Sequence, residues 1–596
     1  MGRTSYPTNT PLSQPLIDSP AKMRNNQSDS DRSWKGSALA LILFVWVSIL
    51  LVGPLIFPPT QISTLPYAPE DSYICLWNFW WTKYCLLELQ NPYWTDFLFH
   101  PLGTSLAFHA FPLTYGLVSV PIQLVVKDVT GLVLAMNVVI FFSFVLAAFG
   151  AYRLAVYVTG SRLCGFISGL IYAFIPYHFL NMLSLHLLAI EFLPFYILSL
   201  LKFYDRPSVR QAVFVALWLA ISYYSSLEYT LYLLIFSALW FMYKVRSDHK
   251  GMNRKFLGRL SLAALCFILF AAPLLSQQVA LLFRGESAIK QDFDELVFWS
   301  PALLSFVTPS RFHPVYGRTM SFAGDMKTAT TENWGMRSEA SLGLVTLGLA
   351  FASLIGFRRD GRIFWLIAGL CFLSLALGPY LRLTGARLTD IPLPYLLLYK
   401  YIPILRAGRD PTRFVPLAML MLSIVAAFSV RGLLRRIQTK GMRLLVTTIL
   451  AGLVLFESAA MSVGSYKPEV HPVYRRLAQQ PGHFAIIDLT PEPYKLLPQA
   501  IHGKRLTYLE KTIPRSSSKD WMLPVEYDFR FPEKLLNLSP SELTTRFQEY
   551  RVGLRKYNIK YVIFPMSRQA RLQIELAMHL GARISEEQGL FLCEFP

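Results

Sequence analysis

The amino-acid sequence predicts an all-α polytopic membrane domain followed by a smaller C-terminal α/β domain. Three observations lead to this prediction: apolar runs of membrane-spanning length, basic residues gathered in the short loops between them, and a change of composition after Gly464. Hydrophobic residues make up 53% of the 596 residues and charged residues only 16%, whereas soluble domains average about 25% charged residues. Most of the chain is therefore expected to lie in lipid.

Eleven apolar runs approach or reach the length that a helix needs to cross a hydrocarbon core, which is about 17–25 residues. The predicted spans are residues 37–57, 131–152, 163–179, 185–201, 209–223, 227–243, 256–279, 340–357, 363–380, 414–430 and 444–464. We therefore expect a domain of about 11 transmembrane helices over residues 37–464.

The loops between these spans alternate in charge. Every loop of one set carries a net positive charge, and residues 431–443 hold basic residues with no acid. Because Lys and Arg are enriched in cytoplasmic loops, this set is assigned to the cytoplasm and the other set to the outside. The external set includes residues 58–130, 280–339 and 381–413, and by parity it also includes residues 465–596.

The N-terminal residues 1–36 are rich in Ser, Asn, Pro and Gln and are predicted to be a disordered cytoplasmic tail. The run at 37–57 lacks an A-x-A-like cleavage site, so we interpret it as an uncleaved first span of a multi-pass plasma (inner) membrane protein. Residues 111–126 are apolar but short, with Pro112 and Pro121. A crossing there would put the tail and the basic loops on opposite sides, so an interfacial or re-entrant helix on the outer face is favoured.

The C-terminal residues 465–596 differ from the rest of the chain. Strand-like runs occur at residues 484–489, 560–565 and 589–595, and a helix is expected over 540–557. Ser539 with Glu542 makes a capping box at the start of that helix. Alternating strands and helices predict an extracytoplasmic α/β domain.

Several function classes are disfavoured. The formal charge of +20 does not indicate nucleic-acid binding, because the basic residues lie in the loops between apolar runs. The sequence contains no Walker A motif, no G-x-G-x-x-G after a strand, no HExxH and no G-x-S-x-G. This argues against an ATP-driven pump, an enzyme built on a Rossmann unit and a membrane metalloprotease.

The first external loop is the richest in chemistry-bearing residues. It begins with the adjacent acids Glu70 and Asp71, and a dense aromatic segment and His100 follow. A carboxylate at the membrane surface could act as general base for an incoming hydroxyl, and aromatic rings could pack on the apolar face of a sugar. The alternative is an interfacial aromatic belt. The aromatic candidates are Trp77, Trp80 and Trp81.

Two further clusters are candidates. His178 and His186 lie at the external ends of inner spans, as do Glu191 and Glu228. Ionisable groups in apolar runs usually face a cavity or a partner, and the alternative is a structural hydrogen bond between helices. The second cluster is a set of arginines, Arg406, Arg409 and Arg413, whose spacing puts them on one face if the segment is helical.

Arginine is well suited to bind phosphate because its planar fork gives bidentate hydrogen bonds. A lipid phosphate at the outer membrane surface is the natural candidate for these external arginines. The alternative is a set of ion pairs with acids in residues 280–339.

Together these features resemble the bacterial membrane glycosyltransferases of the GT-C superfamily, including the YfhO-like proteins. The resemblance covers most of residues 37–464 and the external domain. The matching elements are Glu70-Asp71, the Trp-rich segment with His100-Pro101-Leu102-Gly103, Arg153 through Arg162, Ile175-Pro176-Tyr177-His178, Ser225-Ser226 and Leu405-Arg406 through Arg413-Phe414.

The resemblance implies hexosyl or pentosyl transfer on the non-cytoplasmic face, from a polyprenyl-phosphate-linked donor to a glycan, lipid or protein acceptor. In such enzymes an acid of the first external loop serves as base or binds the acceptor, which maps to Asp71 with Glu70 as alternate. We expect no obligatory metal and no other cofactor. Two alternatives are a transporter or flippase of lipid-linked saccharides and a non-catalytic cell-envelope assembly factor. No internal repeat is found, which favours an enzyme over a transporter.

Overall fold

The fold was analysed in a computed structural model of the chain. The described residues are 34–63, 69–247, 253–284, 293–310, 312–316, 337, 340–354, 361–383, 390–402, 406, 408–459, 464–491, 494–509 and 522–596. The predicted N-terminal tail lies almost wholly outside them, as does the side chain of Glu70.

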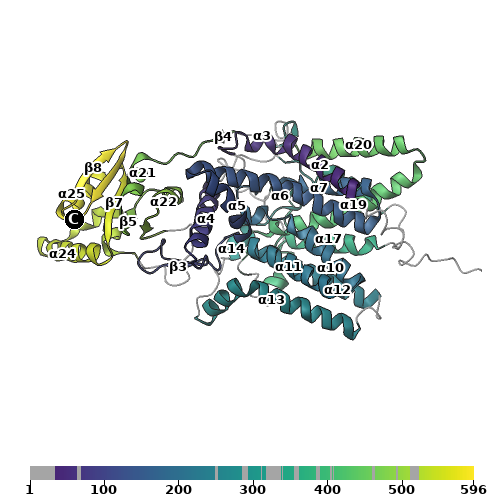
Figure 1. Ribbon diagram of the computed structural model, residues 1–596, viewed down its shortest axis with the longest axis horizontal. Helices are drawn as coiled ribbons and strands as arrows, with labels where there is room; N and C mark the ends of the chain where they lie inside the picture. Colours follow the sequence, from purple (N-terminus) through teal and green to yellow (C-terminus); the bar gives the residue numbers. More distant parts are fainter. Residues whose placement is uncertain are drawn as a thin grey trace, which may run out of the picture.

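A bundle of helices makes up the larger part of the molecule, and its long helices run side by side along the long axis (Figure 1). The helices of the bundle, long and short, are α2 (Trp34–Leu51), α3 (Gly53–Ile56), α6 (Asp128–Thr159), α7 (Arg162–Ala173), α8 (Pro176–Leu180), α9 (Leu185–Leu188), α10 (Phe192–Asp205), α11 (Val209–Ser225), α12 (Leu227–Ser247), α13 (Arg254–Phe283), α16 (Leu344–Ala352), α17 (Arg362–Ala376), α19 (Val415–Arg436) and α20 (Lys440–Glu457). Each predicted span contains helix, which confirms a polytopic α-helical architecture in general terms.

Among the described residues, five helical segments are long and apolar enough to cross a membrane by length and composition. They are Asp128–Thr159, Arg162–Leu180, Leu185–Asp205, Arg254–Phe283 and Pro411–Arg436. Lys35–Leu51, Leu113–Val125 and Arg362–Ala376 are apolar but shorter. The predicted number of eleven crossings therefore stays a prediction.

The bundle has a buried centre and an apolar outer surface. Helices α6, α7 and α19 pack on one another at the centre. At Gly169 on α7 the approach is so close that a Cβ atom would lie 2.6 Å from the carbonyl oxygen of Ala148. On the periphery, α13 exposes Leu265, Ile268 and Leu269 by half or more. An exposed apolar surface of this kind fits contact with lipid.

The two ends of the bundle differ in their connections. At one end the last two turns of α6 meet the start of α2, where Arg153 Nη1 donates to Ser37 Oγ at 3.1 Å. At the other end strand β1 (Ile62–Ser63), after the first helix, pairs with strand β4 (Ser465–Tyr466), after the last. The first external loop and the C-terminal residues therefore lie at the same end, as the parity of the predicted spans requires.

That second end carries the helices and strands of the connecting segments. They are α4 (Pro69–Leu87), α5 (Leu113–Val125), α14 (Phe293–Trp299), α18 (Pro394–Tyr401), the 3-10 helices η1 (Leu303–Phe306) and η5 (Pro411–Phe414), and the hairpin strands β2 (Trp94–Thr95) and β3 (Thr104–Ser105). Helix α5 corresponds to the segment predicted to be interfacial. Thr114 at its start donates to the carbonyl of Ile221 in the last turn of α11 (3.4 Å), and α6 begins three residues after its end.

The C-terminal residues form an α/β unit with a five-stranded mixed sheet. The strand order is β6-β5-β7-β9-β8; β6, β5 and β7 are parallel, and β9 and β8 are antiparallel additions. The elements are α21 (Pro472–Gln479), β5 (Ala485–Asp488), α22 (Leu496–His502), β6 (Arg505–Leu506), α23 (Pro524–Arg530), η6 (Pro532–Asn537), α24 (Pro540–Lys556), β7 (Ile559–Pro565), α25 (Ala570–His579), β8 (Arg583–Glu587) and β9 (Leu590–Glu594). The three predicted strands are confirmed, and so is the Ser539–Glu542 capping box of α24.

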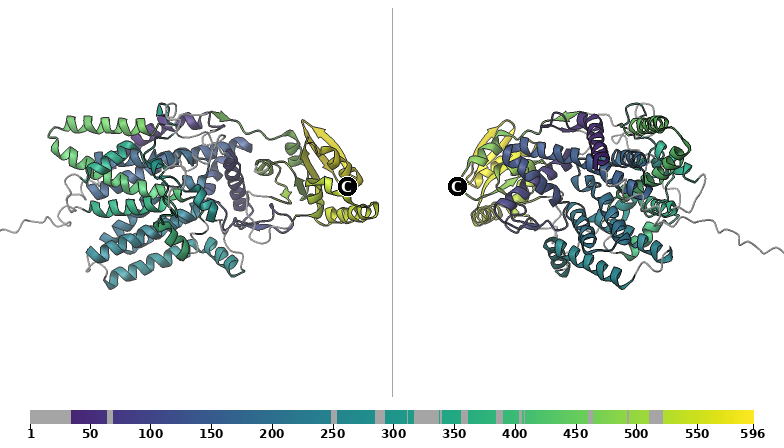
Figure 2. Two further views of the ribbon diagram at one scale, coloured as in Figure 1. Left: turned by 180° about the vertical axis from the view of Figure 1, so that it is seen from behind. Right: turned by 45° about the vertical axis from the view of Figure 1, so that its right-hand side comes forward.

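The C-terminal unit is attached to the first external loop. The backbone N–H of His100 donates to the carbonyl of Leu506 (2.9 Å), and the N–H of Leu506 donates to the carbonyl of Phe97 (2.8 Å). Trp77 Nε1, on α4, donates to Gln499 Oε1 on α22 at 2.8 Å. The loop is therefore held between the bundle and the C-terminal unit, which lies at one end of the molecule in all views (Figure 1, Figure 2).

Candidate functional site

The first candidate residue, Asp71, lies in the first turn of α4 and faces the segment between α8 and α9. Its carboxylate accepts a hydrogen bond from Ser184 Oγ. One turn further along α4, Cys75 Sγ donates to the carbonyl of Leu183 at 3.3 Å. Since Pro69 begins the helix, where its missing N–H costs nothing, the turn that follows presents Asp71 to this segment.

The same segment carries His186 two residues later. Consecutive Cα atoms are about 3.8 Å apart, so the Cα atoms of Ser184 and His186 are separated by at most about 7 Å. His186 is close enough to Arg413, Arg409 and His109 to interact with them electrostatically. The segment 183–186 therefore contacts the predicted base at one end and lies beside two of the predicted phosphate ligands at the other.

Arg413 forms an ion pair with Glu228 at the start of α12. The Arg413 side chain is 13% exposed and that of Glu228 is 26% exposed. Arg413 Nε and Glu228 Oε2 are buried and have no hydrogen-bond partner within the described part of the chain. Buried polar atoms are nearly always bonded, so this pair has the capacity to hold a further polar group.

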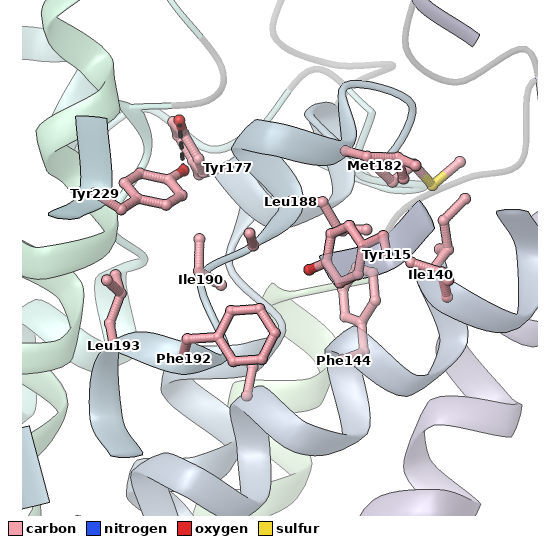
Figure 3. Close-up of a cluster of buried hydrophobic side chains, with 14 of the residues drawn as sticks. Tyr115, Ile140, Phe144, Tyr177, Met182, Leu188, Ile190, Phe192, Leu193 and Tyr229 are labelled. Carbon is pink, nitrogen blue, oxygen red and sulfur yellow. Dashed lines mark hydrogen bonds between the residues drawn. The ribbon is translucent and has the colours of Figure 1, made fainter. Parts of the chain in front are cut away.

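Tyrosine hydroxyls surround the pair. Tyr229 donates to the carbonyl of Leu187 (2.6 Å), and its oxygen lies 3.0 Å from that of Tyr177 (Figure 3). Tyr177 interacts electrostatically with Arg413. These hydroxyls bring hydrogen-bonding groups to the site without adding charge.

Asp410 fixes the start of the helix that carries Arg413. Its carboxylate accepts bonds from the backbone N–H (2.9 Å) and the Oγ1 (2.6 Å) of Thr412, and it pairs with Arg337 at 2.8 Å. Burial alone would raise the pKa of Asp410, but Arg337 and Arg413, together with the Thr412 bonds, hold it below its usual range. Asp410 is therefore an anion at neutral pH and keeps Arg413 in place.

Arg409 lies on the outer edge of this group. It is 3.6 Å from Glu295, and its guanidinium lies over the Trp299 ring at 5.5 Å from the centroid. The ion pair with Glu295 is one of the alternatives expected for the external arginines. Arg409 is 49% exposed at its side chain, so it remains accessible from outside.

The predicted shared helical face of the three arginines is wrong. Arg406 is separated from Arg413 by non-helical residues among those described, and the helix that contains Arg413 starts only at Pro411. Asp410 and Pro411 break the periodicity, since the first caps a new helix and the second occupies its first position. Arg406 instead donates to the carbonyls of Tyr399 (3.1 Å) and Lys400 (2.8 Å) at the end of α18.

The tryptophans predicted to line a sugar site are in the core. Trp77 and Trp81 are 0% exposed, and Trp80 is 8% exposed. Trp77 is bonded to Gln499, and Trp81 Nε1 donates to the carbonyl of Pro92 at 3.0 Å. Their faces pack on one another and are not open to a sugar in this arrangement.

The histidines His100 and His178 also lie apart from the site. His100 Nε2 is 2.9 Å from the carbonyl of Tyr557 in the C-terminal unit. His178 is buried in the bundle, with its ring nitrogens 3.1 Å from Ser143 Oγ and 2.8 Å from the carbonyl of Ala173. Both side chains are engaged in structural hydrogen bonds.

Glu191 makes structural hydrogen bonds between helices, which was the alternative considered for acids in apolar runs. It is 1% exposed and accepts hydrogen bonds from Tyr115 and, at 2.7 Å, from Ser143. Three elements, α5, α6 and the start of α10, are joined by this one carboxyl group. Figure 3 shows Tyr115 within a cluster of buried apolar side chains.

His109 is a site residue that the sequence did not reveal. Its Nε2 is buried without a hydrogen-bond partner, and it interacts with His186. Burial lowers the pKa of His109 to about 4, so the imidazole is neutral at pH 7 and can donate to or accept from a ligand. It is a lone histidine in a loop, with no motif around it that could have marked it.

The described residues contain no group of three or more His, Cys, Asp or Glu side chains that could hold a metal ion. The expectation of a metal-independent reaction stays a prediction.

Comparisons with known proteins give a likeness in fold only. No protein-family model matches the chain, and a search of the curated proteins finds no significant match. Among solved structures, the apo oligosaccharyltransferase of Archaeoglobus fulgidus has a TM-score of 0.48 at 11% identity, over 95% of this chain and 75% of that one. Apo ArnT from Cupriavidus metallidurans has a TM-score of 0.47 at 12% identity, over 93% and 97%.

Proposed function

We propose that this chain is a membrane glycosyltransferase that moves a sugar from a polyprenyl-phosphate-linked donor to an acceptor hydroxyl on the non-cytoplasmic face. One observation carries the proposal. The segment 183–186 contacts Asp71 through Ser184, and His186 on the same segment lies beside Arg409 and Arg413. A base and a phosphate site for one reaction have to be close together, because transfer requires near-contact geometry.

The chemistry follows from these positions. Asp71 accepts the proton of the acceptor hydroxyl as that oxygen attacks the anomeric carbon of the sugar. The bond between that carbon and the donor phosphate oxygen breaks, and the polyprenyl phosphate leaves with an added negative charge. Arg413, Arg409 and His186 are placed to stabilise that charge, which is where catalytic stabilisation is most useful.

Glu228 restricts the conformations that the Arg413 side chain can adopt. The ion pair holds the guanidinium in place before the donor arrives, so that less order has to be gained on binding. Arg413 Nε, which is buried and unpartnered, remains for a phosphate oxygen. His109 Nε2, a second buried donor or acceptor with no hydrogen-bond partner among the described residues, is close enough to His186 to interact with it electrostatically.

The test is transfer of a labelled sugar from a lipid-linked donor in proteoliposomes. Asp71→Asn, alone and combined with Glu70→Gln, is expected to lower the rate by about 10²–10⁴-fold. Asp128→Asn is the matched control, because Asp128 is an exposed acid at the same end of the bundle, paired with Arg475. Undiminished turnover by the double variant would refute the assignment of the base.

The same assay separates the alternatives. A transporter or flippase of lipid-linked saccharides would move the labelled lipid across the bilayer without forming a product. A non-catalytic assembly factor would do neither, and replacement of the acidic pair would leave growth and envelope composition unchanged.

A further inference from the structure

The C-terminal sheet has one face that is only partly covered. One face packs against the apolar sides of α23, α24 and α25. The other face is covered by α21 and α22 over β5 and β7, through residues such as Ile486 and Leu477. Strand β8 lies beyond that cover and is largely exposed. A groove of about 290 Å³ runs between α21 and the uncovered strands.

The strand register arranges the floor of the groove in rows. Tyr561 on β7 lies opposite Glu594 on β9, and Glu594 lies opposite Arg583 on β8. In the next row on the same face, Leu592 lies opposite Ser585. Side chains two residues apart on a strand point to the same face, so these groups line the groove together.

Helix α21 forms the wall with Arg476 and Gln480. Arg476 is paired with Glu587 at 3.2 Å. Its neighbour in the sequence, Arg475, is paired with Asp128 at the start of α6 at 2.8 Å. The groove therefore lies on the side of the C-terminal unit that is joined to the outer end of the bundle.

The charges in and around the groove are not balanced. Glu594 is satisfied by Lys560 (3.4 Å) and by the Tyr561 hydroxyl (3.1 Å). Arg583 has no carboxylate within 4 Å among the described residues. Lys504 is buried next to Gln480, and its Nζ donates to the carbonyls of Gln480 (2.7 Å) and Gly482 (3.1 Å).

Two arginines and one acid, Arg476, Arg583 and Glu594, line the groove, and Lys560 pairs with that acid. Arg583, which has no carboxylate within 4 Å among the described residues, is the group that a bound anion would pair with.

We propose that this groove binds an acidic oligosaccharide and serves as a subsite for the acceptor of the reaction, an inference that rests on the proposed function. Arginine forks recognise carboxylates, and Gln480 and Ser585 can bond to sugar hydroxyls. The volume is close to the lower bound of about 300 Å³ for small-ligand sites, which suits one or two sugar units. The C-terminal unit lies at the far end of the molecule from the basic loops, beyond the long helices (Figure 1), which favours a glycan over a lipid headgroup.

The test uses the full chain in nanodiscs of neutral lipid, with no donor present. Hexagalacturonate is the acidic probe, and maltohexaose of equal length is the neutral one. We expect hexagalacturonate to bind at least tenfold more tightly than maltohexaose, and the double variant Arg476→Gln/Arg583→Gln to lose at least tenfold of that affinity. Arg571→Gln, on the exposed surface of α25, is the matched control and should bind as the parent does.

Three results would overturn the proposal: equal binding of maltohexaose, unchanged binding by the double variant, or displacement of the probe by vesicles that contain an anionic phospholipid at an equal charge concentration. If the double variant unfolds, the single variant Arg583→Gln is used, because Arg583 is exposed and forms no ion pair with any residue that the structure describes. Binding is measured without transfer, so a failure of the proposed function leaves this result standing, and the reverse also holds. In the transfer assay hexagalacturonate should inhibit the parent but not the double variant.

Discussion

The ion pair between Arg413 and Glu228 allows the sharpest test of how the site is built. Replacing Arg413 by Gln leaves a mostly buried carboxylate without its cation. Breaking a buried pair by removing one partner costs about 3–5 kcal/mol. Because the Glu228 side chain keeps 26% of its surface exposed, we expect the lower end, about 3 kcal/mol. Glu228→Gln should cost a similar amount, since it leaves the guanidinium unpaired.

The double variant Arg413→Gln/Glu228→Gln removes both charges. It should be more stable than the sum of the two single effects predicts, by about 1–3 kcal/mol. The free energy of unfolding is measured by denaturant titration in detergent micelles, followed by tryptophan fluorescence. The matched control is the cycle on Arg505 and Asp96, a pair at 2.7 Å whose side chains are 28% and 30% exposed; a more exposed pair should couple by less than about 1 kcal/mol.

The stability cycle and the transfer rate answer different questions. If Arg413 also holds the donor phosphate, the double variant should fold yet transfer sugar at a rate lowered by about 10²-fold or more. Strictly additive stabilities in the cycle would refute the view that the pair is a buried, coupled unit. Full transfer activity by a folded double variant would refute the phosphate role.

Three further predictions concern the groups around the site and the C-terminal unit. Asp410→Asn should destabilise the protein most near pH 7. The folded-state pKa of Asp410 is depressed, so its contribution is lost as the pH falls through that pKa. Parent and variant should therefore converge in thermal unfolding scans as the pH falls below the unfolded pKa of about 3.9. Burial lowers the pKa of His502 to about 3, so its imidazole is neutral in the fold. Below about pH 6.5 the unfolded chain binds a proton that the folded protein does not, so the stability of the parent should fall by up to about 1.4 kcal/mol per pH unit. His502→Gln should flatten that slope. Gln499→Ala leaves Trp77 Nε1 without its partner and removes one of the two hydrogen bonds to the Phe97 carbonyl, which keeps the Leu506 N–H. This should cost about 1–3 kcal/mol and speed proteolytic release of the C-terminal unit.

Local patterns in the sequence were reliable guides to local structure. The apolar runs form helices because the length of a run and its composition are properties of the run itself. The capping box at Ser539 and Glu542 formed as predicted for the same reason, since both partners lie within one turn. Strands β6 and β8 were missed because β6 is only two residues long and β8 is largely polar and exposed.

Contacts between distant residues could not be predicted. Trp77 meets Gln499 across 422 positions, and nothing in the aromatic run shows that it faces the core. Ser184 reaches Asp71 across 113 positions. The sequence singled out Arg413, but its partner Glu228 lies 185 positions away and could not be predicted. No sequence motif around His109 could have marked it as a site residue.

The pairing of β1 with β4 has a consequence for how the protein is made. Ribosomes synthesise a chain from its N-terminus, so Asp71 leaves the ribosome long before Ser465 and Tyr466 are synthesised. Until those residues arrive, β1 lacks its partner strand, and Trp77 lacks Gln499. A nascent chain that stops before Gly464 would thus carry the described helices of the bundle and still lack these contacts, so we expect activity only after the C-terminal unit has been synthesised.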